Sequence, residues 1–176
     1  MPKVILICFV FMISMVDSYG QRSRSHYGNE FIKEESLMKL NKLRRSGCYC
    51  GNEYMPPAGP VKWNYKLVQS AEIQARMMKR YNFFGHVGPD GRDISDKMEM
   101  VDYNWHFAGE NLGEGQRSFH EVLIDWIESK SHCDLLMNGN MNEMGVIKSG
   151  KYWVLHMGKQ LPLGTKRIRE YYSEGR

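Results

Sequence analysis

Gly109-Glu110-Asn111 is the stretch from which the chain is best interpreted, because it lies between two histidines, His86 and His132. Glu110 follows His86 by 24 residues and precedes His132 by 22. Each interval is long enough for one helix or loop to leave and return, so the three side chains could meet in one pocket. A carboxylate between two imidazoles can bind a divalent cation or transfer protons. The spacing predicts a site at His86, Glu110 and His132, although such residues also fall at these intervals by chance.

Length and composition indicate one globular domain. The chain has 176 residues, enough for one sizeable core, and its 42% hydrophobic and 25% charged residues are ordinary for a folded protein. A formal net charge of +4, without clustered Lys and Arg among aromatics, does not favour nucleic acid as a partner.

Residues 1–20 have the pattern of a secretory signal peptide. Lys3 precedes an apolar run from Val4 to Val16, and the small residues of 17–20 offer a cleavage site. The run is shorter than the roughly twenty residues that a membrane helix needs. We therefore expect a secreted, extracellular protein with no transmembrane segment after cleavage; a buried first helix is the disfavoured alternative.

Secretion leaves an odd number of cysteines, because Cys8 departs with the signal and Cys48, Cys50 and Cys133 remain. Cys48 and Cys50 are too close to pair comfortably with each other, so one of them is expected to bridge to Cys133. The remaining thiol could be buried or could form a covalent dimer. A zinc site made of Cys-Xaa-Cys and His132-Cys133 is the alternative.

The domain is expected over residues 30–160, between a polar arm at 21–29 and a basic tail at 161–176 that looks poorly ordered. Pro and Gly predict a loop over 47–60 and no regular structure there. Residues 101–107 read as irregular. Periodicity and capping residues predict an amphipathic helix ending at Gly47, helices after caps at Asn64, Asp93, Ser118 and Ser131, and a hairpin of strands 144–147 and 152–157.

Two further residues could reach the predicted pocket. His106 lies four residues before Glu110, although its aromatic neighbours favour an ordinary loop histidine. Glu143 begins a predicted strand and could equally be a surface residue at the strand end.

Together these segments resemble the CAP superfamily of cysteine-rich secretory proteins, venom antigens and plant pathogenesis-related proteins, and are most similar to its compact, bacterial-like branch. The resemblance runs from Leu37 to Gly158. It is carried by Leu40-Asn41 with Arg44 and Gly47, Trp63-Asn64, Phe83-Phe84-Gly85-His86, Asp90-Gly91, Gly109-Glu110-Asn111, Trp126 to Ser129, His132, Glu143 with Gly145-Val146, and Tyr152-Trp153.

The resemblance implies an α+β fold, an α-β-α sandwich with a small antiparallel β-sheet between helices, in which His86, Glu110 and His132 match three members of a cleft. In the animal branch the fourth is a glutamate at the position of Ser129 here. Glu128 is one residue off and would point about 100° away on a helix. Glu143 is the other substitute considered. The resemblance also favours a Cys50–Cys133 disulfide, which leaves Cys48 unpaired.

The implied function is a secreted, non-enzymatic binding module whose ligand is a divalent cation such as Zn²⁺, a lipid or sterol, or an extracellular protein. The alternative is a metal-assisted, peptidase-like hydrolase with Glu110 or His132 as general base. The chain contains no His-Glu-Xaa-Xaa-His motif. Ser129 and Ser131 lack a nucleophile turn, so an enzyme is disfavoured. In a third interpretation the three residues only hold loops together.

Overall fold

The computed structural model describes residues 30–165. The expected signal peptide at 1–20, the arm at 21–29 and tail residues 166–176 lie outside this range. Of the tail, residues 161–165 have no regular structure but are hydrogen-bonded to a loop. The Leu161 N–H donates to the Asn104 carbonyl at 2.9 Å, and Asn104 Nδ2 donates to the Thr165 carbonyl at 2.8 Å.

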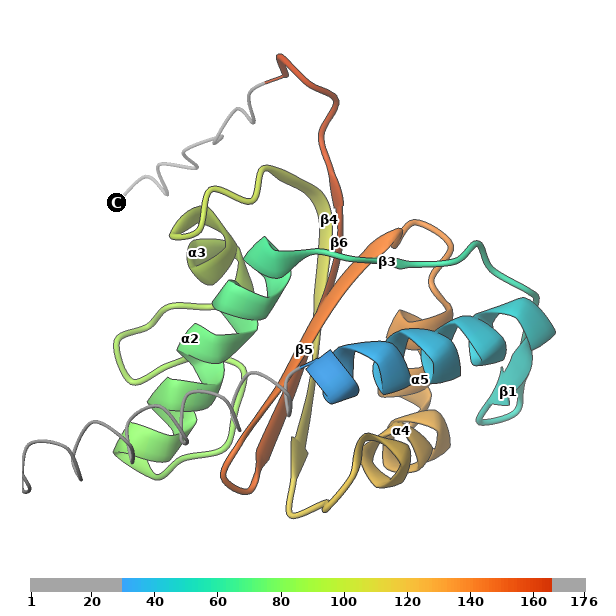
Figure 1. Ribbon diagram of the computed structural model, residues 1–176, viewed down its shortest axis with the longest axis horizontal. Coiled ribbons are helices and arrows are strands. Elements are labelled where there is room, and N and C mark those ends of the chain that lie inside the picture. Colours follow the sequence, from blue (N-terminus) through green and yellow to red (C-terminus); the bar gives the residue numbers. More distant parts are fainter. Residues whose placement is uncertain (1–29, 166–176) are drawn as a thin grey trace, which may run out of the picture.

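Helices alternate along the chain with the strands of two sheets, a two-stranded sheet of β1 and β2 and a four-stranded central sheet (Figure 1). In order, they are a helix over residues 30–46, β1 (Cys48–Cys50), β2 (Glu53–Met55), β3 (Lys62–Trp63), α2 (Tyr65–Tyr81), α3 (Ile94–Glu99), β4 (Trp105–Glu114), α4 (Phe119–Glu128), α5 (Lys130–Met137), β5 (Glu143–Ser149) and β6 (Tyr152–Gln160).

The central sheet has the strand order β3-β5-β6-β4. β5 and β6 form the predicted hairpin, and β6 also pairs with β4, both in antiparallel register. β3 adds two residues in parallel to the start of β5. β4 is therefore an edge strand, and one of its carbonyls, that of Leu112, accepts a hydrogen bond from Trp126 Nε1 at 2.7 Å.

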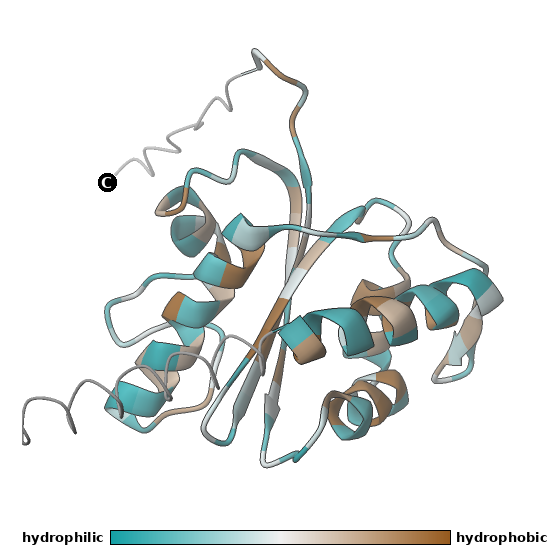
Figure 2. Cartoon of the chain, in the orientation of Figure 1, coloured by the Kyte–Doolittle hydropathy of each residue, from teal (hydrophilic) through white to brown (hydrophobic). Residues whose placement is uncertain are grey.

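Helices cover both faces of the sheet, as the α-β-α prediction requires. α2 and α3 lie on one face, and the helix over residues 30–46 lies with α4 and α5 on the other (Figure 1). Strand side chains alternate between the two faces, so each face has its own apolar layer. Figure 2 shows hydrophobic residues, in brown, recurring along the helices on both sides of the sheet. Trp126, Trp153 and Leu155 belong to the α4 layer, whereas Ala71 and Val154 belong to the α2 layer.

Local capping chemistry sets where the helices begin. Asn64 accepts from the Lys66 N–H, Ser118 accepts from the Glu121 N–H, and Asp93 forms a capping box with Asp96. These predicted caps are confirmed. Ser131 is not a cap: α5 begins earlier, with Ser129 at the N-cap position and no capping hydrogen bond from its side chain.

Two segments that the sequence predicts as irregular contain strands. β1 and β2 form a short hairpin within 47–60, where Pro56-Pro57 follows the second strand instead of interrupting it. The second is β4, which begins at Trp105, inside the stretch 101–107. The glycines and polar residues of β4 obscure the alternation of apolar and polar residues that marks a strand. Gly109 is one position where β4 needs a small residue, because a Cβ there would lie 2.3 Å from Leu135 Cδ1.

Arg44 joins the first described helix to the loops around it although its side chain is fully buried. Its guanidinium donates to the carbonyls of Gly59 (2.7 Å), Leu136 (2.6 Å), Asn138 (3.1 Å) and Met141 (2.9 Å).

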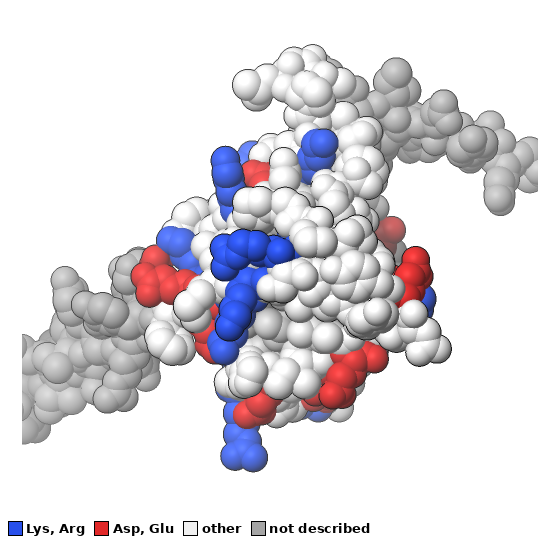
Figure 3. Space-filling view, turned by 90° about the vertical axis from the view of Figure 1, so that its right-hand side faces the viewer, with Lys and Arg blue, Asp and Glu red and all other residues white. Residues whose placement is uncertain are grey.

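The surface on the β1 side of the molecule shows basic side chains near its middle with acidic ones around them (Figure 3).

Candidate functional site

The site is built around Glu110, whose carboxylate is buried, with 3% of the side chain exposed. On β4, Glu110 stands directly across from His156 on β6, and both side chains lie on the α2 face of the sheet. His156 Nε2 is 2.8 Å from Glu110 Oε2. Because an ionised carboxylate only accepts hydrogen bonds, His156 donates from Nε2.

His86 contacts the other oxygen of the same carboxylate. Its Nδ1 lies 2.6 Å from Glu110 Oε1, while 57% of the His86 side chain remains exposed. The loop that carries His86 is held from inside the protein by buried polar residues. Gln74 Nε2 donates to the Gly85 carbonyl, and Lys97 Nζ donates to the His86 carbonyl at 3.0 Å.

A hydrogen-bonded chain therefore runs from the interior of α2 to the surface. Ser70 Oγ is 2.7 Å from His156 Nδ1 and also donates to the Leu67 carbonyl at 3.0 Å. The order is Ser70, His156, Glu110 and His86, and only His86 is substantially exposed. Such a chain fixes the orientation of its outermost imidazole.

The charges around Glu110 keep it ionised. Burial acts to raise the pKa of Glu110, but hydrogen bonds from His156 and His86 and the positive charge of Lys97 outweigh it, so the pKa lies below its ordinary value. The hydrogen bond to Glu110 raises the pKa of His86. Burial lowers the pKa of Lys97, whose ammonium is fully enclosed. Glu110 is thus a fixed negative charge that favours the protonated form of His86.

His132 approaches from the opposite face of the sheet. It lies on α5, and its carbonyl accepts a hydrogen bond from Asn111 Nδ2 at 3.1 Å across the edge strand β4. Burial lowers the pKa of His132, and the nearby charge of His86 lowers it further. The charge of His86 thus influences His132, whereas the hydrogen bond to the Glu110 carboxylate is made by His86.

The three predicted side chains do not form a compact ligand triad. Within residues 30–165, the one group of three or more His, Cys, Asp or Glu ligand atoms that lie within 4.8 Å of one another is Cys48, Cys50 and Cys133. Glu110 is consequently placed as a partner of His86 rather than as a third ligand. Of the two histidines of the predicted site, His86 is the one oriented by the buried carboxylate.

The weaker candidates lie elsewhere. Glu143 accepts from Asn64 Nδ2 at 2.9 Å and from Tyr103 Oη at 2.7 Å, so its carboxylate anchors the start of α2 and does not enter the Glu110 cluster. His106 is exposed and stacks edge-on against Phe107. Ser129 joins α4 to α5.

Sequence reasoning missed four buried polar residues of the site, His156, Ser70, Gln74 and Lys97. His156 sits within an apolar strand, where a lone histidine usually indicates a satisfied core residue. The sequence signal that could have identified it is the alternation of side chains along the strand. His156 points to the same face as Val154 and away from Leu155. Using that signal required β4, the strand that the sequence pattern did not reveal.

The structure contains the disulfide Cys50–Cys133, the pairing that the resemblance implies, with a Cα–Cα distance of 5.4 Å. Cys48 is a free thiol. Because two of the three sulfurs form the bridge, the alternative zinc site at these cysteines lacks its thiolates in this state.

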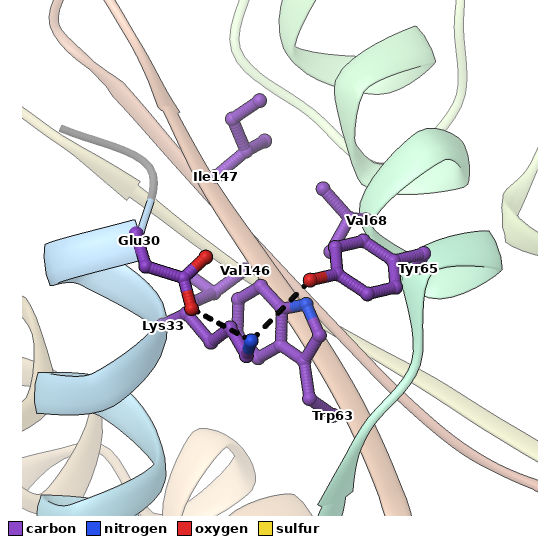
Figure 4. Close-up of a pocket in the computed structure, with 7 residues that line it drawn as sticks. All are labelled: Glu30, Lys33, Trp63, Tyr65, Val68, Val146 and Ile147. Carbon is purple, nitrogen blue, oxygen red and sulfur yellow. Dashed lines mark hydrogen bonds and ion pairs between the residues drawn. The ribbon is translucent and has the colours of Figure 1, made fainter. Parts of the chain in front are cut away.

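A separate hollow of about 180 Å³ lies at the β3 edge of the sheet, between the helix over residues 30–46 and the start of α2 (Figure 4). Lys33 Nζ donates there to Glu30 at 2.8 Å and to Tyr65 Oη at 3.3 Å. Its lining residues are Glu30, Lys33, Trp63, Tyr65, Val68, Val146 and Ile147. The volume of the hollow is below the roughly 300–1,000 Å³ of drug-sized ligand sites.

No helix within residues 30–165 is long and apolar enough to cross a membrane.

Comparisons with known proteins agree with the fold. The chain is 31% identical over 96 residues to the uncharacterized protein YkwD of Bacillus subtilis (53% of this chain, 37% of that protein). It is 24% identical over 100 residues to the uncharacterized membrane protein YlbC of the same organism (57% and 29%). The chain thus spans about a third of the length of these curated relatives.

Solved structures show the same architecture at low sequence identity. An extracellular SCP-domain protein from Bacillus anthracis superposes with a TM-score of 0.61 and 17% identity over 75% of this chain and 43% of its own. An outer surface protein from Borrelia burgdorferi gives a TM-score of 0.63 and 16% identity over 73% and 92%.

The decisive match is to a family model. The model described as the cysteine-rich secretory protein family, CAP, matches residues 37–155, which is more than half of the chain. This protein therefore belongs to the CAP family of cysteine-rich secretory proteins.

Proposed function

We propose that this protein is a secreted, non-enzymatic binding module that holds a divalent cation, Zn²⁺ foremost, between His86 and His132. The observation that carries the proposal is the 2.6 Å contact between His86 Nδ1 and the buried Glu110. With Nδ1–H donated to the carboxylate, the neutral imidazole presents the Nε2 lone pair outward. Carboxylate behind histidine is the usual outer-shell arrangement of a metal-ligating imidazole.

The donor set suits zinc in chemistry but is small. Neutral imidazole nitrogen is a common Zn²⁺ ligand, and two protein ligands leave positions for water or for a partner's side chain. The depressed pKa of His132 keeps that ring neutral, whereas the raised pKa of His86 places a proton in competition with the metal. Weak, pH-dependent binding is the expected result.

Calorimetric titration with Zn²⁺ at pH 7.5 and 5.5 tests the proposal. We expect binding at pH 7.5, its loss at pH 5.5, and its loss at both values in His86→Ala and in His132→Ala. Glu110→Gln should weaken binding by about 10- to 100-fold, the usual effect of removing an outer-shell partner. His106→Ala, an exposed histidine outside the site, is the matched control. Equal heats in the wild type and the His86→Ala, His132→Ala double variant would refute the site.

The hydrolase interpretation finds little support in this geometry. Ser70, His156 and Glu110 have the connectivity of a catalytic triad, but Ser70 is fully buried and already donates its hydroxyl proton to Leu67 or to His156. Both oxygens of Glu110 are engaged and its pKa is lowered, which is unfavourable for a general base. Peptidase or esterase turnover that disappears in Glu110→Gln would overturn this view.

A lipid or sterol ligand is the weaker binding alternative. The hollow beside Trp63 is about 180 Å³ and is crossed by the Lys33 hydrogen bonds, so a sterol would require rearrangement (Figure 4). An extracellular protein is the more compatible second ligand, because the His86 side chain is exposed at the surface.

A further inference from the structure

The free thiol of Cys48 lies against the disulfide. Cys48 and Cys50 are two residues apart on β1, so both side chains point to the same side of the strand, toward α5. Tyr49 between them points out, with 65% exposure. Cys48 Sγ lies 3.7 Å from Cys133 Sγ, and the three sulfurs fall within 4.8 Å of one another.

The surroundings favour contact of the thiol with this particular sulfur. Cys50 and Cys133 are fully buried, and Cys48 packs half-buried beside them with Leu43 and Met55. A sulfur–sulfur separation of 3.7 Å is close to van der Waals contact, so attack requires side-chain rotation rather than movement of the hairpin or the helix. The contact is to Cys133, the member of the bridge that belongs to the other element.

We propose that Cys48 is an intramolecular nucleophile that exchanges the Cys50–Cys133 bridge for a Cys48–Cys133 bridge. The Cys48 thiol loses its proton, and the resulting thiolate attacks Cys133 Sγ. The new sulfur–sulfur bond forms as the bond to Cys50 breaks, and Cys50 leaves as a thiolate that takes up a proton. One disulfide and one thiol are present before and after, so no oxidant or reductant is consumed.

Both products are compatible with the fold. A buried Cys50 thiol behaves as a small apolar side chain. α5 stays covalently attached to β1 in either isomer, and His132, the residue before Cys133, keeps its tether. Burial raises the pKa of the Cys48 thiol, so the thiolate is a small fraction near neutrality and exchange is faster in alkaline solution.

The exchange has a direct consequence for dimers. The neighbouring disulfide is present at a high effective concentration around the Cys48 thiol. Intramolecular exchange therefore competes with formation of a disulfide to a second chain. The expected state of the oxidised protein is a monomer with a population of two bridge isomers.

The first test uses Cys50→Ser in the secreted chain, from which the signal segment with Cys8 has been cleaved, purified in its oxidised form without reductant. We expect a Cys48–Cys133 disulfide, identified by tandem mass spectrometry after acid quenching and alkylation, and a melting temperature that falls on reduction. Cys48→Ser should retain the Cys50–Cys133 bridge. Folded Cys50→Ser with two free thiols, or with a Cys48–Cys48 dimer, would overturn the proposal.

The second test uses the unmodified sequence and so does not depend on any variant folding. Oxidised protein is incubated at pH 8.5, quenched in acid, and labelled with N-ethylmaleimide under denaturing conditions at pH 5. Among Cys48, Cys50 and Cys133, we expect the label at Cys48 at time zero and a growing fraction at Cys50 with time, resolved by fragmentation at Tyr49; any label on Cys8 is read from a separate peptide. Labelling that remains at Cys48 alone after prolonged incubation would refute the exchange.

Discussion

At the scale of single residues, the site depends on one buried charge. Glu110 has both oxygens hydrogen-bonded to imidazoles, His86 outside and His156 inside, and Lys97 adds a positive charge nearby. An ionised carboxylate without these partners would be strongly disfavoured at 3% exposure. The proton affinity of His86 is therefore set by a residue that solvent does not reach.

We predict that the two cleft histidines titrate on opposite sides of the ordinary value of 6.5, His86 above it and His132 below it. An NMR titration that follows the imidazole signals from pH 5 to 9 measures both pKa values. Glu110→Gln should lower the pKa of His86, because the hydrogen bond to the carboxylate is the largest cause of its shift. The control is Glu114→Gln. Glu114 lies on β4 like Glu110, and its carboxylate pairs with Lys151 at the surface. An unchanged His86 titration in Glu110→Gln would contradict the assignment.

The opposite pKa shifts of His86 and His132 make their contributions to stability depend on pH in opposite directions. The folded state binds the His86 proton more tightly than the unfolded chain, so its contribution is full below pH 6.5 and is lost as pH rises through the folded pKa. His132 prefers its neutral form in the folded state, so its contribution is lost as pH falls below 6.5. The contribution of Glu110 is present above its unfolded pKa and is lost in acid.

At the scale of elements, the backbone of α2 packs directly against β5 at Gly145. A Cβ added at Gly145 would lie 2.3 Å from the Val68 backbone nitrogen and 2.6 Å from the Leu67 carbonyl carbon. Both atoms belong to a helix backbone that cannot rotate away. This contact brings α2, and with it Ser70, within reach of His156.

Gly145→Ala should therefore lower the free energy of unfolding by about 3 kcal/mol, the upper range of overpacking effects, because α2 must move from the sheet. Urea denaturation measures it. Gly139→Ala has open space around the added methyl group and should change stability by less than about 0.5 kcal/mol. Equal stability of the two variants would show that α2 is not held against β5.

Elements with a clear period could be predicted, and elements without one could not. Leu67, Ala71 and Met78 repeat at helical spacing behind the Asn64 cap, and all three are buried in α2 as expected. β4 was not predicted because its sequence contains two glycines and the charged Glu110, which only a cross-strand partner makes acceptable. His86 and Glu110 were predicted to meet and do, but the role of His156 depended on that unseen pairing.

At the scale of the whole molecule, Arg44 connects parts of the chain that are nearly 100 residues apart. Its four carbonyl partners include Met141, at a separation of 97 residues. A buried guanidinium with this many donors replaces water for several backbone oxygens at once. The resemblance marks Arg44 as a motif residue, and its buried bonds explain why an arginine suits that position.

Arg44→Met should reduce the free energy of unfolding by at least about 3 kcal/mol, since several buried carbonyls lose a charged donor. The neighbouring Arg45→Met, at an exposed position, should change it by no more than about 0.5 kcal/mol. Thermal or urea denaturation of both variants checks the difference. A loss confined to Arg45→Met, or none in either, would be inconsistent with the buried network.

The strand order β3-β5-β6-β4 also determines when the cleft can exist during synthesis. β6, the last strand along the chain, is the only neighbour that joins β4 to the rest of the sheet within residues 30–165. A nascent chain on the ribosome that has not yet exposed residues 152–160 therefore holds Glu110 without His156, and His86 without a fixed orientation. Glu110 and His156 can therefore meet only after residues 152–160 have left the ribosome and paired with β4.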